Sequence, residues 1–81
     1  METVASALTL DAASTGQRLR IRSISGDTRF VSRITAIGLT EGCAVEVLQN
    51  VRSRPVLVFA RDSTIAVDRD DCAHIGVEVA L

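Results

Sequence analysis

One stretch near the middle of the chain constrains the fold more than any other. From Arg33 to Val47 the sequence reads RITAIGLTEGCAVEV, and its apolar residues change from helical spacing to alternate spacing. Gly38 and Gly42 stand on either side of the turn between the two patterns. Gly38 lies where a helix needs a left-handed residue in order to end. The pattern predicts a short α-helix over residues 28–37 that turns directly into a strand.

The predicted helix has a start signal and an apolar face. Asp27 precedes it and is a good N-cap, because its carboxylate can accept hydrogen bonds from the amides of the first turn. Phe30, Ile34 and Ile37 then recur on one face. Several residues in this stretch have mediocre helix propensity. We give periodicity more weight than propensity here and retain the helix.

Apolar alternation and one nearly continuous apolar run predict five strands, over residues 17–24, 43–49, 56–60, 64–67 and 75–79. Residues 10–16 and 68–73 are each expected to form a single helical turn. Short strands with tight connections predict a mainly β fold, a small antiparallel barrel with one helix between its first and second strands. The expected core consists of Leu19, Ile21, Phe30, Ile34, Ile37, Val45, Val47, Val58, Ile65, Val67, Ile75 and Val77.

Size and charge narrow the possible functions. The 81 residues predict one domain over residues 1–81, too small to spare much material for a catalytic pocket. All nine basic residues are arginines, and ten acidic residues give a net charge of −1. Domains that grip phosphate backbones usually carry a clear positive excess. The composition therefore argues against nucleic acid as a partner.

The termini and cysteines suggest a reducing compartment. Cys43 and Cys72 form no CxxC pair and are expected to be free thiols. The first residues have no basic region followed by a long apolar run, so we expect no signal peptide. No apolar run approaches the roughly 20 residues that cross a bilayer. We therefore expect a cytoplasmic protein that does not insert into a membrane.

Three arginines in the first predicted strand leave an alternative open. Arg18, Arg20 and Arg22 alternate onto one face, where they could follow an RNA backbone. They could equally pair with Glu46 or Glu78 on neighbouring strands. No aromatic residue is interleaved for base stacking, which favours the second interpretation. A small-barrel RNA-binding module remains the alternative.

One cluster has the residue types of a metal site. Cys72, His74 and Asp71 could together bind Fe²⁺ or another transition metal. Their spacing fits no established ligand pattern, and acidic residues at a helix start are explained by the helix dipole. We therefore expect no metal or cofactor and keep these three residues as the candidates. With one histidine and no P-loop or nucleophile signature, we also expect no catalytic residues and no enzyme activity.

The order of these motifs resembles the FeoA family over residues 8–79, most clearly in Ile37-Gly38-Leu39-x-x-Gly42. The resemblance implies an SH3-like β-barrel, similar to the C-terminal module of iron-dependent repressors of the diphtheria-toxin-repressor type. It also implies a small cytoplasmic accessory protein of bacterial ferrous iron uptake, with the GTPase domain of the membrane transporter FeoB as its partner. Stimulation of the GTPase, assembly and gating all remain open mechanisms, and a metal-sensing domain is a further alternative.

The turn after the helix and one strand residue are the candidate partner contacts. They are Leu39, Thr40, Glu41 and the outward Leu48. An apolar side chain at a loop tip can anchor a partner, because buried apolar groups dominate interface energy. Alternatively, Leu39 folds back onto the helix end as a capping contact.

Overall fold

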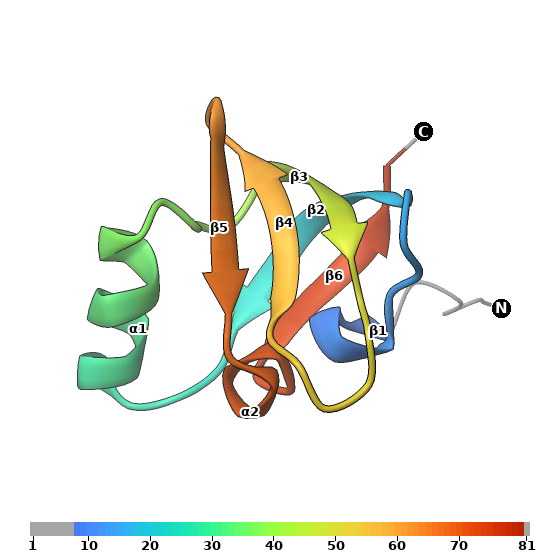
Figure 1. Cartoon of the computed structure of the whole chain (residues 1–81). Helices are drawn as coiled ribbons and strands as arrows, with labels where there is room; N and C mark the ends of the chain where they lie inside the picture. The colour runs from blue at the N-terminus through green and yellow to red at the C-terminus, as the bar shows by residue number, and fades with distance from the viewer. Residues whose placement is uncertain (1–7, 81) are drawn as a thin grey trace, which may run out of the picture.

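A computed structural model describes residues 8–80 of the chain. Along the chain the elements are β1 (Leu8–Thr9), η1 (Leu10–Ala12), β2 (Arg18–Ile24), α1 (Thr28–Ala36), β3 (Ala44–Gln49), β4 (Val56–Ala60), β5 (Ser63–Val67), α2 (Arg69–Cys72) and β6 (Ile75–Val79). The six strands form one antiparallel sheet in the order β1-β6-β2-β3-β4-β5, rolled into an SH3-like barrel (Figure 1).

None of the helices within residues 8–80 is long and apolar enough to span a membrane. The expectation of no signal peptide concerns the first seven residues, which lie outside the described residues.

The predicted fold class is confirmed, with small differences in its elements. All five expected strands are present, and α1 lies between β2 and β3 as expected. β1 was not predicted, because two residues carry no periodicity. Strand β5, the fourth of the expected strands, begins at Ser63 instead of Thr64, because Arg61 and Asp62 alone make the preceding turn.

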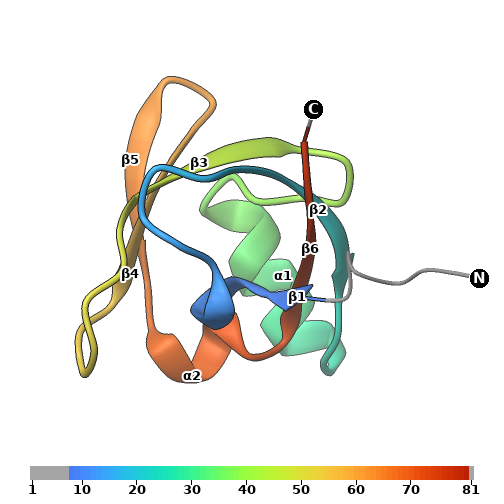
Figure 2. The same ribbon diagram turned by 90° about the vertical axis from the view of Figure 1, so that its right-hand side faces the viewer.

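The sheet curls because its central strands are bulged. β2 pairs with β3 on one side and β6 on the other, and Leu19 lies opposite both Val45 and Val79. The register shifts between Ile21 and Ser23 on β2, and again along β3. Bulges of this kind bend and twist a strand. Figure 2 looks into the resulting roll, with β4 and β5 on one side and β2 and β6 on the other.

The core is built from aliphatic side chains and one cysteine, Cys72. Most of the expected core residues are buried: Leu19, Ile21, Ile34, Val45, Val47, Val58, Val67, Ile75 and Val77. Three expectations need correction: Phe30 and Ile65 are only half-buried, and Ile37 is 39% exposed because α1 ends at Ala36 and Ile37 is its C-cap. The core also contains residues that were not predicted as core: Leu10, Ala13, Leu39, Val56, Ala60 and Cys72.

Helix α1 begins and ends by the predicted signals. The amide of Phe30 donates to the Asp27 carboxylate at 2.9 Å, which is the expected N-cap. Gly38 has a φ of 107°, and its amide donates to the Thr35 carbonyl at 3.0 Å. The amide of Leu39 donates to the Ile34 carbonyl at 3.2 Å. These two bonds form a Schellman motif, which turns Leu39 back toward the helix and into the core.

Candidate protein-interaction site

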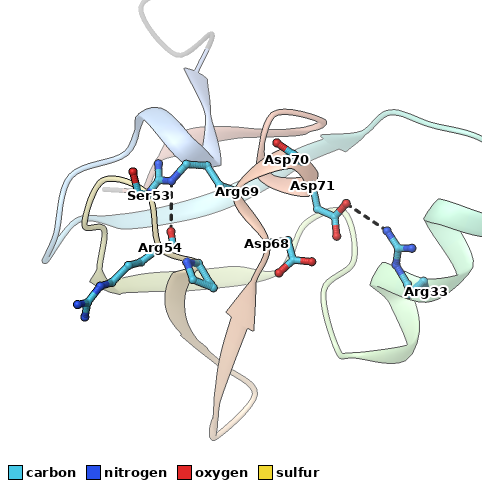
Figure 3. Close-up of a pocket in the computed structure, with 8 residues that line it drawn as sticks. Arg33, Ser53, Arg54, Asp68, Arg69, Asp70 and Asp71 are labelled. Carbon is cyan, nitrogen blue, oxygen red and sulfur yellow. Dashed lines mark hydrogen bonds and ion pairs between the residues drawn. The ribbon is translucent and has the colours of Figure 1, made fainter.

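A charged cleft opens where α1, α2 and the β3–β4 loop meet (Figure 3). Its volume is about 580 Å³. Three arginines and three aspartates line it, together with one serine and one proline, so neither sign of charge dominates. The lining residues are Arg33, Ser53, Arg54, Pro55, Asp68, Arg69, Asp70 and Asp71. Such a mixed wall fits a mixed-charge protein surface better than it fits a polyanion.

One wall of the cleft is fixed by a hydrogen-bond network. Arg69 Nη2 donates to Asn50 Oδ1 at 2.6 Å and to the Val51 carbonyl at 2.8 Å, and its Nε donates to the Arg54 carbonyl at 3.2 Å. The Asn50 amide nitrogen donates in turn to the carbonyl of Asp11, at 3.1 Å, and to that of Ala13. These bonds tie the β3–β4 loop to α2 and η1.

No pattern in the sequence marks Asn50 or Arg69 as functional residues. Their partners lie far along the chain, and both residues sit outside any apolar periodicity. A loop asparagine and an arginine after an aspartate are common in sequences, so no local signal marks this pair.

The other wall is held by contacts at the surface. Arg33 Nη2 lies 3.1 Å from Asp71 Oδ1, and most of the Arg33 side chain stays solvent-exposed. The Arg33 guanidinium also lies 5.4 Å from the centre of the Phe30 ring. The Phe30 ring in turn meets the His74 ring edge-on, with 5.6 Å between the centres. An exposed ion pair of this kind contributes about 0–1 kcal/mol.

The structure does not bring the three metal-ligand candidates together. Cys72 is buried, and its thiol donates to the Val67 carbonyl at 3.6 Å. Burial raises the pKa of Cys72 to about 12, and the nearby Asp11 carboxylate adds to this effect. A protonated, buried thiol is a poor metal ligand. His74 is exposed, Asp71 faces Arg33, and residues 8–80 contain no cluster of three or more His, Cys, Asp or Glu side chains able to hold a metal.

The four partner-contact candidates fall in different places. Leu39 is fully buried, so the expectation of an exposed anchor at this residue is wrong. Thr40 accepts a hydrogen bond from Arg61 Nη2 at 3.1 Å, and Glu41 is exposed beside it. Leu48 is 39% exposed, but it lies on β3, four residues beyond the strand's first residue. At ~3.3 Å per residue that separation is ~13 Å along the strand, so Leu48 does not extend the turn surface.

The arginine row of β2 has partners within the sheet. Arg18 lies opposite Glu46 in the β2–β3 register. Arg20 Nη1 donates to the Gly42 carbonyl at 3.0 Å. Arg22 Nε lies 3.9 Å from Glu78 Oε1. These contacts agree with a solvated strand face that pairs with neighbouring strands.

Fold and site together define the class of domain: a small SH3-like barrel with a mixed-charge cleft and no metal-binding cluster in its described part. The sequence matches the FeoA domain family over residues 8–79, and the chain belongs to this family. The family expectation from the sequence is therefore confirmed.

Several solved structures share the fold of this chain. A crystal structure of an iron uptake regulatory protein (FeoA) superposes with a TM-score of 0.87 at 18% identity, covering 91% of this chain and 99% of that chain. The solution structure of FeoA from Chlorobium tepidum gives 0.81 at 20% identity, covering 91% and 71%. A manganese-dependent transcriptional repressor in complex with manganese gives 0.85 at 19% identity, covering 95% of this chain but 38% of the repressor. No curated protein matches the sequence significantly.

Proposed function

We propose that this protein is a cytoplasmic accessory protein of bacterial ferrous iron uptake that binds the GTPase domain of a FeoB-like membrane transporter. The observation that carries the proposal is the FeoA family match, which spans nearly all of the described barrel. A structural relative of similar length is named an iron uptake regulatory protein. The role is binding, and the described residues are assigned no catalytic step.

The charged cleft is the surface that we assign to this interaction. One wall is fixed by the Arg69 and Asn50 network, which holds the backbone of Arg54 in place beside it. Asp68 and Asp70 line the same cleft and supply the opposite charge. Alternating charges specify the orientation of a partner and suppress wrong partners. A protein surface with its own mixed charges would complement this cleft.

The two other functions considered from the sequence have less support. A metal-sensing role draws on the fold shared with manganese-dependent repressors, but Cys72 is buried and protonated. RNA binding draws on the arginine row, but Arg20 and Arg22 already have partners in the sheet. Neither alternative is favoured by a specific contact.

Titration of the purified chain against the isolated cytoplasmic domain of the cognate transporter tests the proposal. The titration is run with GDP, with a GTP analogue and without nucleotide. We expect Arg54→Glu to weaken binding, since it reverses a charge in the cleft. Arg52→Glu is the matched control, because Arg52 is exposed nearby but does not line the cleft. Absence of binding in every nucleotide state would contradict the proposed function.

A further inference from the structure

Strand β5 lies at one end of the sheet. It pairs with β4 over its whole length, from Ala60 opposite Ser63 to Val56 opposite Val67. No strand among the described residues pairs with its other side. In Figure 1 the next element beyond β5 is α1, and the turn that follows this helix approaches β5 where Gly38 lies beside the Ile65 side chain.

The hairpin geometry fixes which backbone groups point outward. Arg61 and Asp62 form a two-residue turn with φ values of 52° and 64°, as in a type I′ turn. The pair that closes such a turn, Ala60 and Ser63, exchanges both of its hydrogen bonds. Every second residue along β5 then bonds to β4. Thr64 and Ala66 therefore direct their N–H and C=O groups away from β4.

These outward groups have no backbone partner within residues 8–80. Neither Thr64 nor Ala66 takes part in a backbone hydrogen bond outside the regular elements, and both residues are exposed. Two donors and two acceptors therefore line the edge in strand geometry. Unpaired edges of this kind are templates for another strand.

Strand β5 itself carries none of the usual sequence features that protect an edge against strand pairing. Native edges are commonly blunted by charged side chains, proline or a bulge. The sequence of β5 is STIAV, and its register with β4 is regular throughout. The opposite edge of the sheet differs, because β1 has only two residues. An edge that is five residues long and uncharged, and whose outward-facing residues Thr64 and Ala66 are exposed, is suited to receive an extended segment.

Charges at the two ends of β5 indicate which segment fits. Asp62 precedes the strand and Asp68 follows it. If a second copy paired antiparallel about Ile65, Asp62 of each copy would face Asp68 of the other. Like charges placed opposite each other destabilise a strand pair. A segment with basic residues at its ends and β-branched residues at its centre would complement the edge instead.

We propose that β5 is a strand-addition site: an extended segment of the protein partner, β-branched at its centre and basic at its ends, pairs with the backbone of Thr64 and Ala66. This proposal rests on the proposed function, because the transporter's cytoplasmic domain is the partner to be tested. Main-chain hydrogen bonds supply affinity in this mode of recognition, and side chains supply specificity.

Proline at position 66 tests the proposal through the backbone. Ala66→Pro removes the edge-facing N–H and leaves every bond to β4 in place, since proline is tolerated where the amide faces outward from an edge strand. Ala66→Val keeps the amide and is the matched control. We expect Ala66→Pro to weaken binding of the transporter domain by roughly tenfold, the effect of losing one well-formed interfacial hydrogen bond. Equal binding by wild type, Ala66→Pro and Ala66→Val would overturn the strand-addition site.

Amide hydrogen exchange of the wild-type chain gives a second readout that needs no variant. In the free protein the amides of Thr64 and Ala66 should exchange faster than those of Ile65 and Val67. On adding the transporter domain, Thr64 and Ala66 should become protected. Binding without this protection would overturn strand addition and leave the proposed function standing. If the wild-type chain does not bind the domain at all, both proposals fail.

Discussion

The barrel is closed differently on its α2 side and on its α1 side. On the α2 side, Leu10, Ala13, Cys72 and Ile75 are buried together, and the Asn50–Arg69 network joins η1, the β3–β4 loop and α2. On the α1 side, Ile34 is the helix's fully buried residue. The remaining contacts of α1 include half-buried Phe30 and the exposed Arg33–Asp71 pair.

This difference predicts which side of the barrel is rigid and which side is accessible to a partner. Buried apolar area and satisfied polar groups dominate stability, so the α2 side should be the rigid part of the fold. The α1 side has fewer buried contacts, and it borders both the charged cleft and the open edge of β5. Regions that bind partners are drawn from the less stable part of a protein. The β5 edge lies on this side, whereas the charged cleft lies between the two sides, with Arg33 from α1 and its fixed wall from the α2 side.

The largest predicted effect concerns the residue that anchors the end of α1. Leu39→Asp places an unpaired carboxylate in the core, where Leu39 is fully buried. We expect a loss of about 4 kcal/mol or more in unfolding free energy, enough to unfold much of so small a domain. Urea denaturation followed by circular dichroism measures it. Leu39→Met is the control and should cost less than about 1.5 kcal/mol. An unchanged denaturation midpoint for Leu39→Asp would contradict the buried position.

A second prediction concerns alkaline pH and the α2 side. The thiol of Cys72 has its pKa raised by burial from 9.0 to about 12. Above pH 9 the unfolded chain releases this proton while the folded chain keeps it. The contribution of the protonated Cys72 thiol to the unfolding free energy is therefore fully present below pH 9. It is lost as pH rises toward 12, and the unfolding free energy falls by no more than about 1.4 kcal/mol per pH unit.

The chain contains no lysine and no tyrosine, so neither of these residue types titrates in the same pH range and obscures the effect of Cys72. Urea denaturation between pH 8 and pH 11 measures the effect. In Cys72→Ala the unfolding free energy should decline much less over this pH range, whatever its value at pH 8. A decline that is equally steep in Cys72→Ala would show that the buried thiol is not its source.

The polar network of the α2 side should have a smaller effect. Asn50→Ala leaves the backbone carbonyls of Asp11 and Ala13 without their donor and removes an acceptor of Arg69. We expect a loss of about 1–3 kcal/mol in unfolding free energy, since these groups are at least partly buried. Asn50→Asp keeps the oxygen that faces Arg69 but loses the donors, so it separates the two contributions. Wild-type stability in both variants would contradict the network's role.

The corresponding polar contact on the α1 side should matter least. Arg33→Ala removes an ion pair whose arginine is mostly solvent-exposed. We expect a loss of about 0–1 kcal/mol, shrinking further at high salt. Denaturation at two salt concentrations checks this. A loss as large as that of Asn50→Ala would show that the two sides of the barrel are held equally firmly.

Local signals in the sequence predicted most of the fold. The N-cap at Asp27 and the left-handed Gly38 act within one turn of α1, so they can be recognised from their neighbours alone. The burial of Leu39 follows from the same helix end, although the sequence left its direction open. Ile37 shows the limit of periodicity, because the helix ends one residue before it.

The cleft was harder to predict from the sequence than the fold. The aspartates near Cys72 were recognised as a group, but their relation to Arg33 depends on how α1 meets α2. Asn50 reaches Asp11 and Ala13 only because the β3–β4 loop folds against η1. Likewise, the outward groups of Thr64 and Ala66 follow from the hairpin register and not from their side chains. Contacts between distant segments leave little trace in a single sequence.

Native-state hydrogen exchange across the whole chain tests the lower stability of the α1 side most directly. Low concentrations of urea separate amides that exchange by local opening from those that exchange only by global unfolding. We predict that the amides of Ile34 and its neighbours in α1 exchange through a local opening, at a lower free energy than the amides of β2 and β6. Equal free energies for α1 and these strands would contradict the account.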